Sequence, residues 1–166
     1  MITKNAINNG VFMGVTFIVS SYMLYLVDNQ SFIALKSSIL FLVFLLLLYK
    51  TGTDARRQNG GIISYSTVFK DLFFAAIMGT FLCSVFEYLL FNFIDPSLKE
   101  QVKETFYKAA EEMQASGNKD LYQKLVNTVK AEDIYSITYC TAQFFVRIFM
   151  PCALFSAILA YLIRRN

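Results

Sequence analysis

Four stretches of this sequence are apolar over lengths comparable to the thickness of a lipid bilayer. A membrane-spanning helix needs about 20 mostly apolar residues, and the four stretches cover residues 6–27, 32–49, 72–94 and 134–163. Hydrophobic residues make up 56% of the 166-residue chain and charged residues only 16%. One domain of this size has too little interior to hide so much apolar surface from water. The sequence therefore predicts an all-α, four-helix polytopic membrane protein.

The residue types that usually carry catalysis, metal binding or nucleic-acid recognition are scarce. The chain has no histidine, only three cysteines and a net charge of only +3. Histidine is the commonest metal ligand and the usual neutral-pH base, and a nucleic-acid reader carries a stronger basic patch. The sequence contains no glycine-rich phosphate loop, zinc motif or serine nucleophile elbow. We therefore expect a protein that is not an enzyme, uses no cofactor or metal ion and binds no nucleic acid.

The distribution of basic residues orients the spans in the membrane. The first stretch stays apolar as far as Val27, which favours a retained anchor helix over a cleaved signal peptide. With the N-terminus and the C-terminus in the cytoplasm, every arginine outside the spans lies on the inner side: Arg56, Arg57, Arg164 and Arg165. Residues 50–61 are then predicted to form a basic, flexible loop that contacts anionic lipid. The lysines of residues 95–133, interleaved with acids, are placed outside.

Residues 95–133 are predicted to form an extracytoplasmic amphipathic helical hairpin between the third and fourth spans. Asp95 is a favourable N-cap, and Pro96 fits the first helical position. Apolar side chains then recur every three or four residues: Leu98, Val102, Phe106, Ala110 and Met113. Residues 116–118 should end this helix, and residues 121–129 should form the second. The hairpin is interpreted as a solvated cap on the bundle, with a dedicated partner-binding site as the alternative.

Small residues at every fourth position allow membrane helices to approach closely. Such series occur in the first, third and fourth stretches: Ala6, Gly10 and Gly14; Ala75, Gly79 and Cys83; Ala153 and Ala157. The three series lie mainly in the cytoplasmic half on the proposed topology, so we expect these helices to pack together there. The second stretch has an unbroken apolar run over residues 39–49, and such a helix is either lipid-exposed or fully buried. The predicted packing leaves this helix outermost.

Two ionisable residues lie deep inside the predicted spans, Glu87 in the third and Arg147 in the fourth, whereas Lys36 is near the start of the second. Their depths differ by only about 4 Å at a rise of 1.5 Å per residue. An unpaired charge at such a depth costs about 2.5–3.5 kcal/mol. The sequence therefore predicts an ion pair between Glu87 and Arg147 that faces the interior of the bundle.

Other polar residues and a proline accompany this pair. Ser84 and Asn92 lie on the third span and Gln143 on the fourth. The missing N–H of Pro151 frees the carbonyl of Arg147 and should bend the helix there. The region has two interpretations, a buried pair that fixes helix register and a polar site for a lipid head group, a proton or an ion. The structural interpretation is preferred because the opposite charges neutralise each other.

Several short motifs, each present once, are spread along nearly the whole chain. They are Lys4-Asn5-Ala6 with Gly10 and Gly14; Asn59-Gly60-Gly61-Ile62-Ile63-Ser64-Tyr65 with Val68-Phe69-Lys70; Phe91-Asn92-Phe93-Ile94-Asp95-Pro96; and Leu162-Ile163-Arg164-Arg165. In these motifs the chain resembles the bacterial membrane proteins grouped as domain of unknown function 4199. The resemblance implies a Gram-negative inner-membrane protein with four spans and an extracytoplasmic helical segment. It implies no activity, because the family has none assigned.

The sequence as a whole predicts an uncharacterised protein of the bacterial inner membrane. We expect it to act as a structural or accessory subunit, with another membrane protein or a second copy of itself as its partner in the bilayer. The alternative is a small transporter or flippase component that works through the Glu87–Arg147 region. The sequence specifies neither the partner, nor a substrate, nor the oligomeric state.

Overall fold

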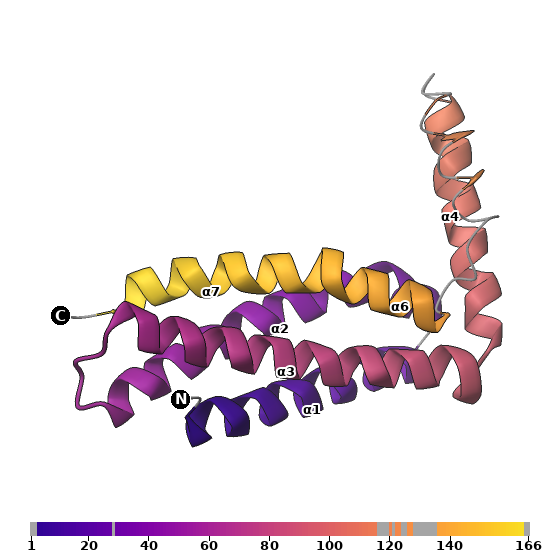
Figure 1. Cartoon of the computed structure of the whole chain (residues 1–166). Coiled ribbons are helices and arrows are strands. Elements are labelled where there is room, and N and C mark those ends of the chain that lie inside the picture. Colours follow the sequence, from indigo (N-terminus) through magenta and orange to yellow (C-terminus); the bar gives the residue numbers. More distant parts are fainter. Residues whose placement is uncertain are drawn as a thin grey trace. The chain divides into compact units, whose positions relative to one another are not determined.

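The computed structural model describes residues 3–27, 29–115, 120, 122–123, 126–127 and 136–164. The side chains of a few residues inside these ranges, including Gln143 and Arg147, lie outside the description. The regular elements of the described chain are helical (Figure 1): α1 (Lys4–Val27), α2 (Asn29–Gln58), α3 (Tyr65–Leu89), the π-helix η1 (Leu90–Ile94), α4 (Ser97–Ala115), α6 (Ile137–Gln143), the π-helix η2 (Phe144–Phe149) and α7 (Met150–Ile163).

Three helical segments of the described chain are long and apolar enough to cross a membrane. They are Lys4–Val27, Leu35–Gln58 and Tyr65–Ile94. The helix Met150–Ile163 is also apolar but is shorter than a membrane span on its own. The predicted all-α class is confirmed, and these three helices are those of a membrane protein.

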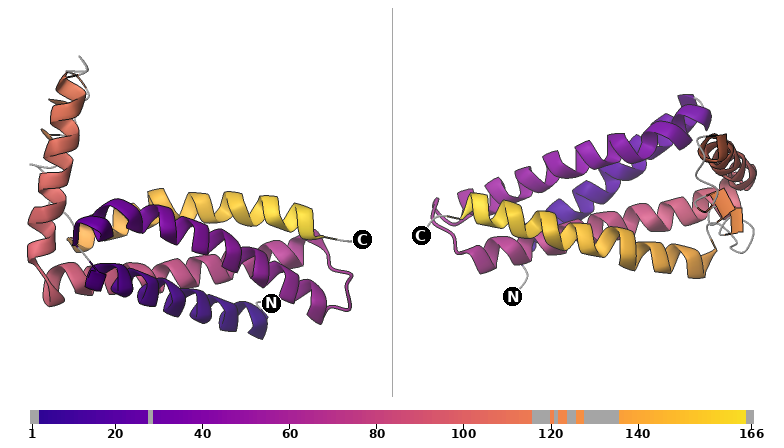
Figure 2. Two further views of the ribbon diagram at one scale, coloured as in Figure 1. Left: turned by 180° about the vertical axis from the view of Figure 1, so that it is seen from behind. Right: turned by 90° about the horizontal axis from the view of Figure 1, so that it is seen from above.

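The chain divides into two compact units, Met1–Phe86 with Gln143–Asn166, and Glu87–Ala142. In the first unit α1, α2, α3 and α7 run side by side (Figures 1 and 2). Each of these helices contributes buried apolar side chains to one core, among them Met13, Phe17, Phe44, Leu48, Leu72, Ala76, Cys152 and Ala160. The core of the first unit is therefore shared by all of its long helices.

The second helix is not the outermost helix of the bundle, so the predicted arrangement is wrong at this point. The ring of Phe44 lies 6.5 Å from the ring of Phe17 on α1 and 6.2 Å from that of Phe155 on α7. Leu48 is fully buried, whereas Leu42 and Leu46 point outward. An apolar helix without a polar face gives no periodic signal for its buried side, and the structure shows that α2 buries one side only.

The predicted loop at residues 50–61 is also wrong, because α2 continues to Gln58. Gly52 belongs to the packing of this helix, since its missing side chain makes room for Ile163 and Leu72. The connection to α3 begins only after Gln58, with Gly60 and Gly61 at φ of 69° and 90°. Only glycine adopts this left-handed region without strain, and glycine commonly ends a helix in this way.

Helix α3 begins at Tyr65, one and a half to two turns before the predicted start of the third span. The hydroxyl of Ser64 accepts a hydrogen bond from the backbone N–H of Thr67 at 3.4 Å, as an N-cap does. The early start brings Asp71 into the helix. This residue lies just outside the predicted third span, which begins with the apolar run at Leu72.

The second unit contains the amphipathic helix α4. The carboxylate of Asp95 accepts hydrogen bonds from the backbone N–H of Ser97 at 3.1 Å and from the Ser97 hydroxyl, at the start of the helix. Pro96 precedes the first helical residue. The predicted apolar stripe is buried at Leu98, Val102 and Ala110. The side chain of Met113, residues 116–118 and most of residues 121–129 lie outside the described residues.

The helix that precedes Pro151 changes its hydrogen-bonding pattern. Residues Phe144–Phe149 are π-helical, and Pro151 lies in the first turn of α7. Proline removes an N–H from the helical ladder, and a π-helical turn is one way in which a helix adjusts to such a gap. The π-helical residues include Arg147, and the bend expected there stays a prediction.

Candidate functional site

A buried carboxylate contacts the N-terminus of α1. Asp71 is only 2% exposed, and its Oδ2 atom accepts a hydrogen bond from the Thr3 hydroxyl at 2.9 Å. The Thr3 oxygen in turn accepts a hydrogen bond from the backbone N–H of Ala6 at 3.1 Å, so Thr3 is the N-cap of α1. The N-terminal end of a helix carries a partial positive charge that favours a nearby anion. Thr3 therefore joins α3 to the start of α1.

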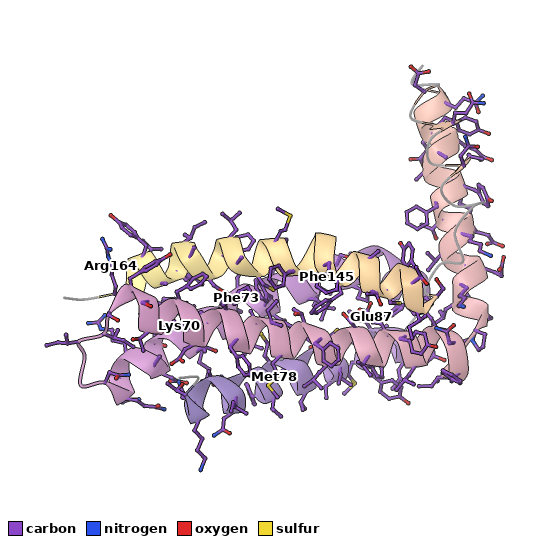
Figure 3. The ribbon with its side chains drawn as sticks, in the orientation of Figure 1. Lys70, Phe73, Met78, Glu87, Phe145 and Arg164 are labelled. Atoms are coloured by element: carbon purple, nitrogen blue, oxygen red, sulfur yellow. The ribbon has the colours of Figure 1, made fainter. Side chains whose placement is uncertain are left out.

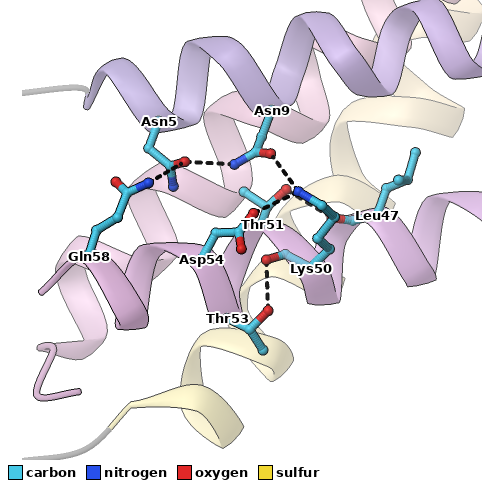
Figure 4. Close-up of polar contacts among 8 residues, drawn as sticks. All are labelled: Asn5, Asn9, Leu47, Lys50, Thr51, Thr53, Asp54 and Gln58. Carbon is cyan, nitrogen blue, oxygen red and sulfur yellow. Dashed lines mark hydrogen bonds and ion pairs between the residues drawn. The ribbon is translucent and has the colours of Figure 1, made fainter. Parts of the chain in front are cut away.

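A second group of polar side chains links the same part of α1 to α2 (Figure 4). The Asn5 Oδ1 atom accepts hydrogen bonds from Asn9 Nδ2 at 2.9 Å and from Gln58 Nε2 at 3.1 Å. Lys50 Nζ lies 3.5 Å from Asn9 Oδ1 and 2.7 Å from Asp54 Oδ2. We call these five residues, together with Thr3 and Asp71, the polar cluster.

The bonds of the polar cluster hold α1 against α2 and α3. Amide groups bond to each other within α1 and between α1 and α2, the Thr3 hydroxyl bonds to the Asp71 carboxylate on α3, and Lys50 and Asp54 on α2 pair with each other. The Lys50–Asp54 pair is partly exposed, at 52% and 32% of its side chains, and such pairs contribute about 0–1 kcal/mol. Among the described residues no group of three or more His, Cys, Asp or Glu side chains could hold a metal ion.

Three buried polar atoms have no hydrogen-bond partner among the described residues. They are Nδ2 of Asn5 and the hydroxyls of Ser21 and Ser156. Asn5 lies in the polar cluster, whereas the two serines lie on the buried faces of α1 and α7. A buried serine in an apolar helix also serves as a small side chain that lets a neighbouring helix approach.

The predicted small residues of α1 and α3 lie against the opposite helix. A Cβ atom added at Gly10 would lie 3.2 Å from the backbone Cα of Ala75, and one added at Gly79 would lie 2.8 Å from Cγ of Met13. A Cβ atom added at Gly14 would lie 2.6 Å from Cδ1 of Leu82. All three glycines therefore sit where two helices approach more closely than a larger side chain would allow.

The predicted small residues of α7 occupy a different position. Ala153 and Ala157 are only half-buried, whereas Cys152, Ser156 and Ala160 form the buried side of the helix. Both series repeat at every fourth residue, so spacing alone cannot select the series that faces inward. The inward series is displaced by one residue from the predicted one.

The predicted ion pair cannot be placed, because the side chain of Arg147 lies outside the described residues, as does that of Gln143. Glu87 is half-buried near the end of α3 (Figure 3). The Ser84 hydroxyl donates a hydrogen bond to the Thr80 carbonyl at 3.0 Å. The Glu87–Arg147 pair stays a prediction.

Asn92, predicted as a polar neighbour of the pair, has hydrogen-bond partners within the second unit. Its Nδ2 atom donates to the Tyr88 carbonyl at 2.8 Å, and its Oδ1 atom accepts from Lys99 Nζ at 2.8 Å. Asn92 thereby connects the π-helix η1 to the first turn of α4.

Sequence reasoning did not identify the polar cluster. A signal was present, because Asn5 and Asn9 are four residues apart, and Lys50, Asp54 and Gln58 repeat the same spacing. Residues four apart lie on one face of a helix. When two apolar helices each carry such a row of polar side chains at one end, those side chains are expected to form hydrogen bonds with each other.

The fold defines a small helical membrane protein in which the polar cluster connects α1 to α2 and α3. The chain belongs to the family described as Protein of unknown function (DUF4199), whose model matches residues 8–165. The predicted resemblance is thereby confirmed over nearly the whole chain. Comparison with curated proteins and with solved structures gives no match.

Proposed function

We propose that this protein is a non-enzymatic accessory subunit of a bacterial inner-membrane complex, which it joins through the outer face of α1. In this proposal the chain crosses the membrane four times, with both ends in the cytoplasm and residues 95–133 outside. Two features support the topology. Helix α1 begins and α7 ends at the same end of the first unit (Figures 1 and 2), as an even number of crossings requires. The helical stretch from α6 through α7 also exceeds the about 20 residues that a span needs.

One observation carries the accessory role, namely a line of β-branched side chains along the outer face of α1. Ile7, Val11, Val15 and Val19 repeat at every fourth residue, and each is between 40% and 51% exposed. Glycines 10 and 14 lie on the buried side of the same helix. Helix α1 therefore has a packed side and a separate, regular side that the described residues leave exposed.

This line is better suited to a protein helix than to lipid alone. Helices associate in membranes mainly through van der Waals packing. β-Branched side chains are restricted at χ1 in a helix and lose little freedom when a neighbour packs against them. The outward side of α2 carries instead the more flexible Leu42 and Leu46. This difference between the two helices supports α1 as the docking helix.

The proposed topology can be tested by cysteine labelling. In a variant without the native cysteines, a single cysteine at Lys108 should react with a membrane-impermeant maleimide in intact spheroplasts. A single cysteine at Arg57 should react only after the membrane is opened. Labelling of position 57 in intact spheroplasts would overturn the proposed orientation, and this result would leave the packing of the helices untouched.

The docking surface can be tested by photo-crosslinking in living cells. A photoreactive amino acid at Val15 should give one discrete adduct with another membrane protein, because this side chain lies in the middle of the β-branched line. The matched control is Leu46, which is more exposed and lies on α2. The same adducts from both positions, or an adduct only with a second copy of this chain, would contradict the accessory role.

A further inference from the structure

A shallow groove of about 450 Å³ opens where α3 begins and α7 ends. It is lined by Tyr65, Ala157, Ile158, Tyr161, Leu162 and Arg164. Ala157, the smallest of the lining residues, lies one turn before Tyr161 on α7. The groove is apolar along α7 and carries one positive charge, that of Arg164, where α7 ends.

The positive charge is positioned by an aromatic ring. The guanidinium carbon of Arg164 lies 4.3 Å from the centre of the Tyr161 ring, and Arg164 directly follows the last residue of α7. Among the residues that the structure describes, no carboxylate forms an ion pair with Arg164. Stacking on a ring fixes a guanidinium while leaving its in-plane N–H groups able to bind an anion.

The apolar side of the groove continues as a series of aromatic rings on α3. The rings of Tyr65 and Phe69 are stacked at 6.0 Å, those of Phe69 and Phe73 are stacked at 5.7 Å, and Phe73 contacts Phe149 at 5.3 Å. Arg164 and Phe73 are labelled in Figure 3, which also shows Lys70 toward the Arg164 end of α3. The surface thus changes from charged to apolar along the direction of the helices.

We propose that this groove binds one anionic glycerophospholipid, with its phosphate at Arg164 and an acyl chain along Ala157 and Ile158. Tyrosine and arginine at the end of a membrane helix occupy the depth of the lipid head groups, and an apolar channel beginning at that depth matches a lipid tail. The complementarity between the Arg164 cation and a phosphate favours a lipid over a second helix. An anionic lipid is favoured over a zwitterionic one because the latter carries its own ammonium group to offset the phosphate charge. The proposal requires α7 to lie in the membrane, which the labelling experiment tests separately, and it does not depend on the accessory role.

The affinity of the purified full-length chain for lipid tests this proposal. Native mass spectrometry in neutral detergent can measure the binding of phosphatidylglycerol and phosphatidylcholine with identical acyl chains. We expect one site with about fivefold preference for phosphatidylglycerol, the gain expected for one basic residue near a membrane surface. Arg164→Gln should abolish this preference, and Arg164→Lys should retain most of it.

Two control pairs separate the groove from general electrostatics. Arg57→Gln removes an exposed charge from the last turn of α2 and should keep the preference. Ala157→Phe should fill the groove and lower the affinity for both lipids at least fivefold. Leu154→Phe, on the exposed side of α7, should leave both affinities unchanged. Circular dichroism of each variant verifies that it is folded.

Several outcomes would overturn the proposal. An unchanged preference in Arg164→Gln would show that Arg164 does not hold the head group. Equal losses in Arg164→Gln and Arg57→Gln would indicate diffuse charge attraction. Competition by millimolar inorganic phosphate would indicate a site for free anions, and a stable dimer in place of a lipid adduct would show that a second chain occupies the groove.

Discussion

Replacing Gly14 with leucine is expected to lower the free energy of unfolding by about 3 kcal/mol, the upper end of the range for overpacked sites. A Cβ atom at this position would lie 2.8 Å from the Cβ atom of Leu82 on α3, which cannot move aside without its backbone. The substitution would therefore force α1 away from α3 at a point where the two helices are in close contact. Unfolding of the purified protein by sodium dodecyl sulfate in mixed micelles, followed by circular dichroism, measures the change.

The neighbouring residue provides the matched control for this experiment. Val15 lies on the exposed side of α1, so Val15→Leu adds apolar volume to the same helix without meeting α3. We expect this variant to unfold within about 0.5 kcal/mol of the parent chain. If Gly14→Leu and Val15→Leu have the same free energy of unfolding, the close contact between α1 and α3 does not contribute to stability.

The second large effect is expected for Thr3→Val, which should also cost about 3 kcal/mol. The change removes the N-cap of α1, worth about 1 kcal/mol. It also removes the hydroxyl that donates a hydrogen bond to the buried carboxylate of Asp71, and losing a bond to a charged group costs about 1.5–3 kcal/mol. Thermal unfolding in detergent should show the loss in Thr3→Val and little change in Thr3→Ser.

A double-variant comparison tests whether Thr3 acts through Asp71. Replacing both residues with valine should restore part of the stability lost in Thr3→Val, because no buried carboxylate is then left without its donor. Thr16→Val is the control within the same helix, since the Thr16 hydroxyl bonds only to the Phe12 carbonyl one turn back among the described residues. Additive losses for Thr3 and Asp71 would show that the two side chains are not energetically coupled.

The helical class of the fold and the close approach of α1 to α3 were predictable from the sequence. Long apolar segments force helices in a bilayer because each backbone N–H must be bonded within its own segment. Glycines at fourth positions in α1 and α3 mark close approach, and the structure places Gly10 and Gly79 against the opposite helix. These predictions rest on physical requirements that every membrane helix shares.

The rotation of individual helices was not predictable in the same way. In α2 the sequence is apolar on all sides, so nothing in its pattern distinguishes buried Leu48 from exposed Leu46. In α7 two small-residue series lie side by side. Gly52 resembled a loop residue because its partner, Ile163, is more than one hundred residues away in the sequence. Which side of a helix is buried depends on which other helices become its neighbours.

The site was missed for a related reason. Asp71 stands at the edge of an apolar run, where a charge usually indicates the end of a span. Its inclusion in α3 depends on the cap at Ser64, and its burial depends on Thr3 of another helix. A polar group acquires its role in this protein from a partner that local sequence windows do not contain.

The distances in sequence between α1 and its partners impose an order on biosynthesis. The polar bonds of the α1 end reach partners 41, 53 and 68 residues further along the chain, at Lys50, Gln58 and Asp71. Translation at about 5–20 residues per second needs roughly 3–14 s to make the last of these segments. The start of α1 can therefore bond to α2 first, and the bond from its N-cap Thr3 to Asp71 forms only after α3 has been made.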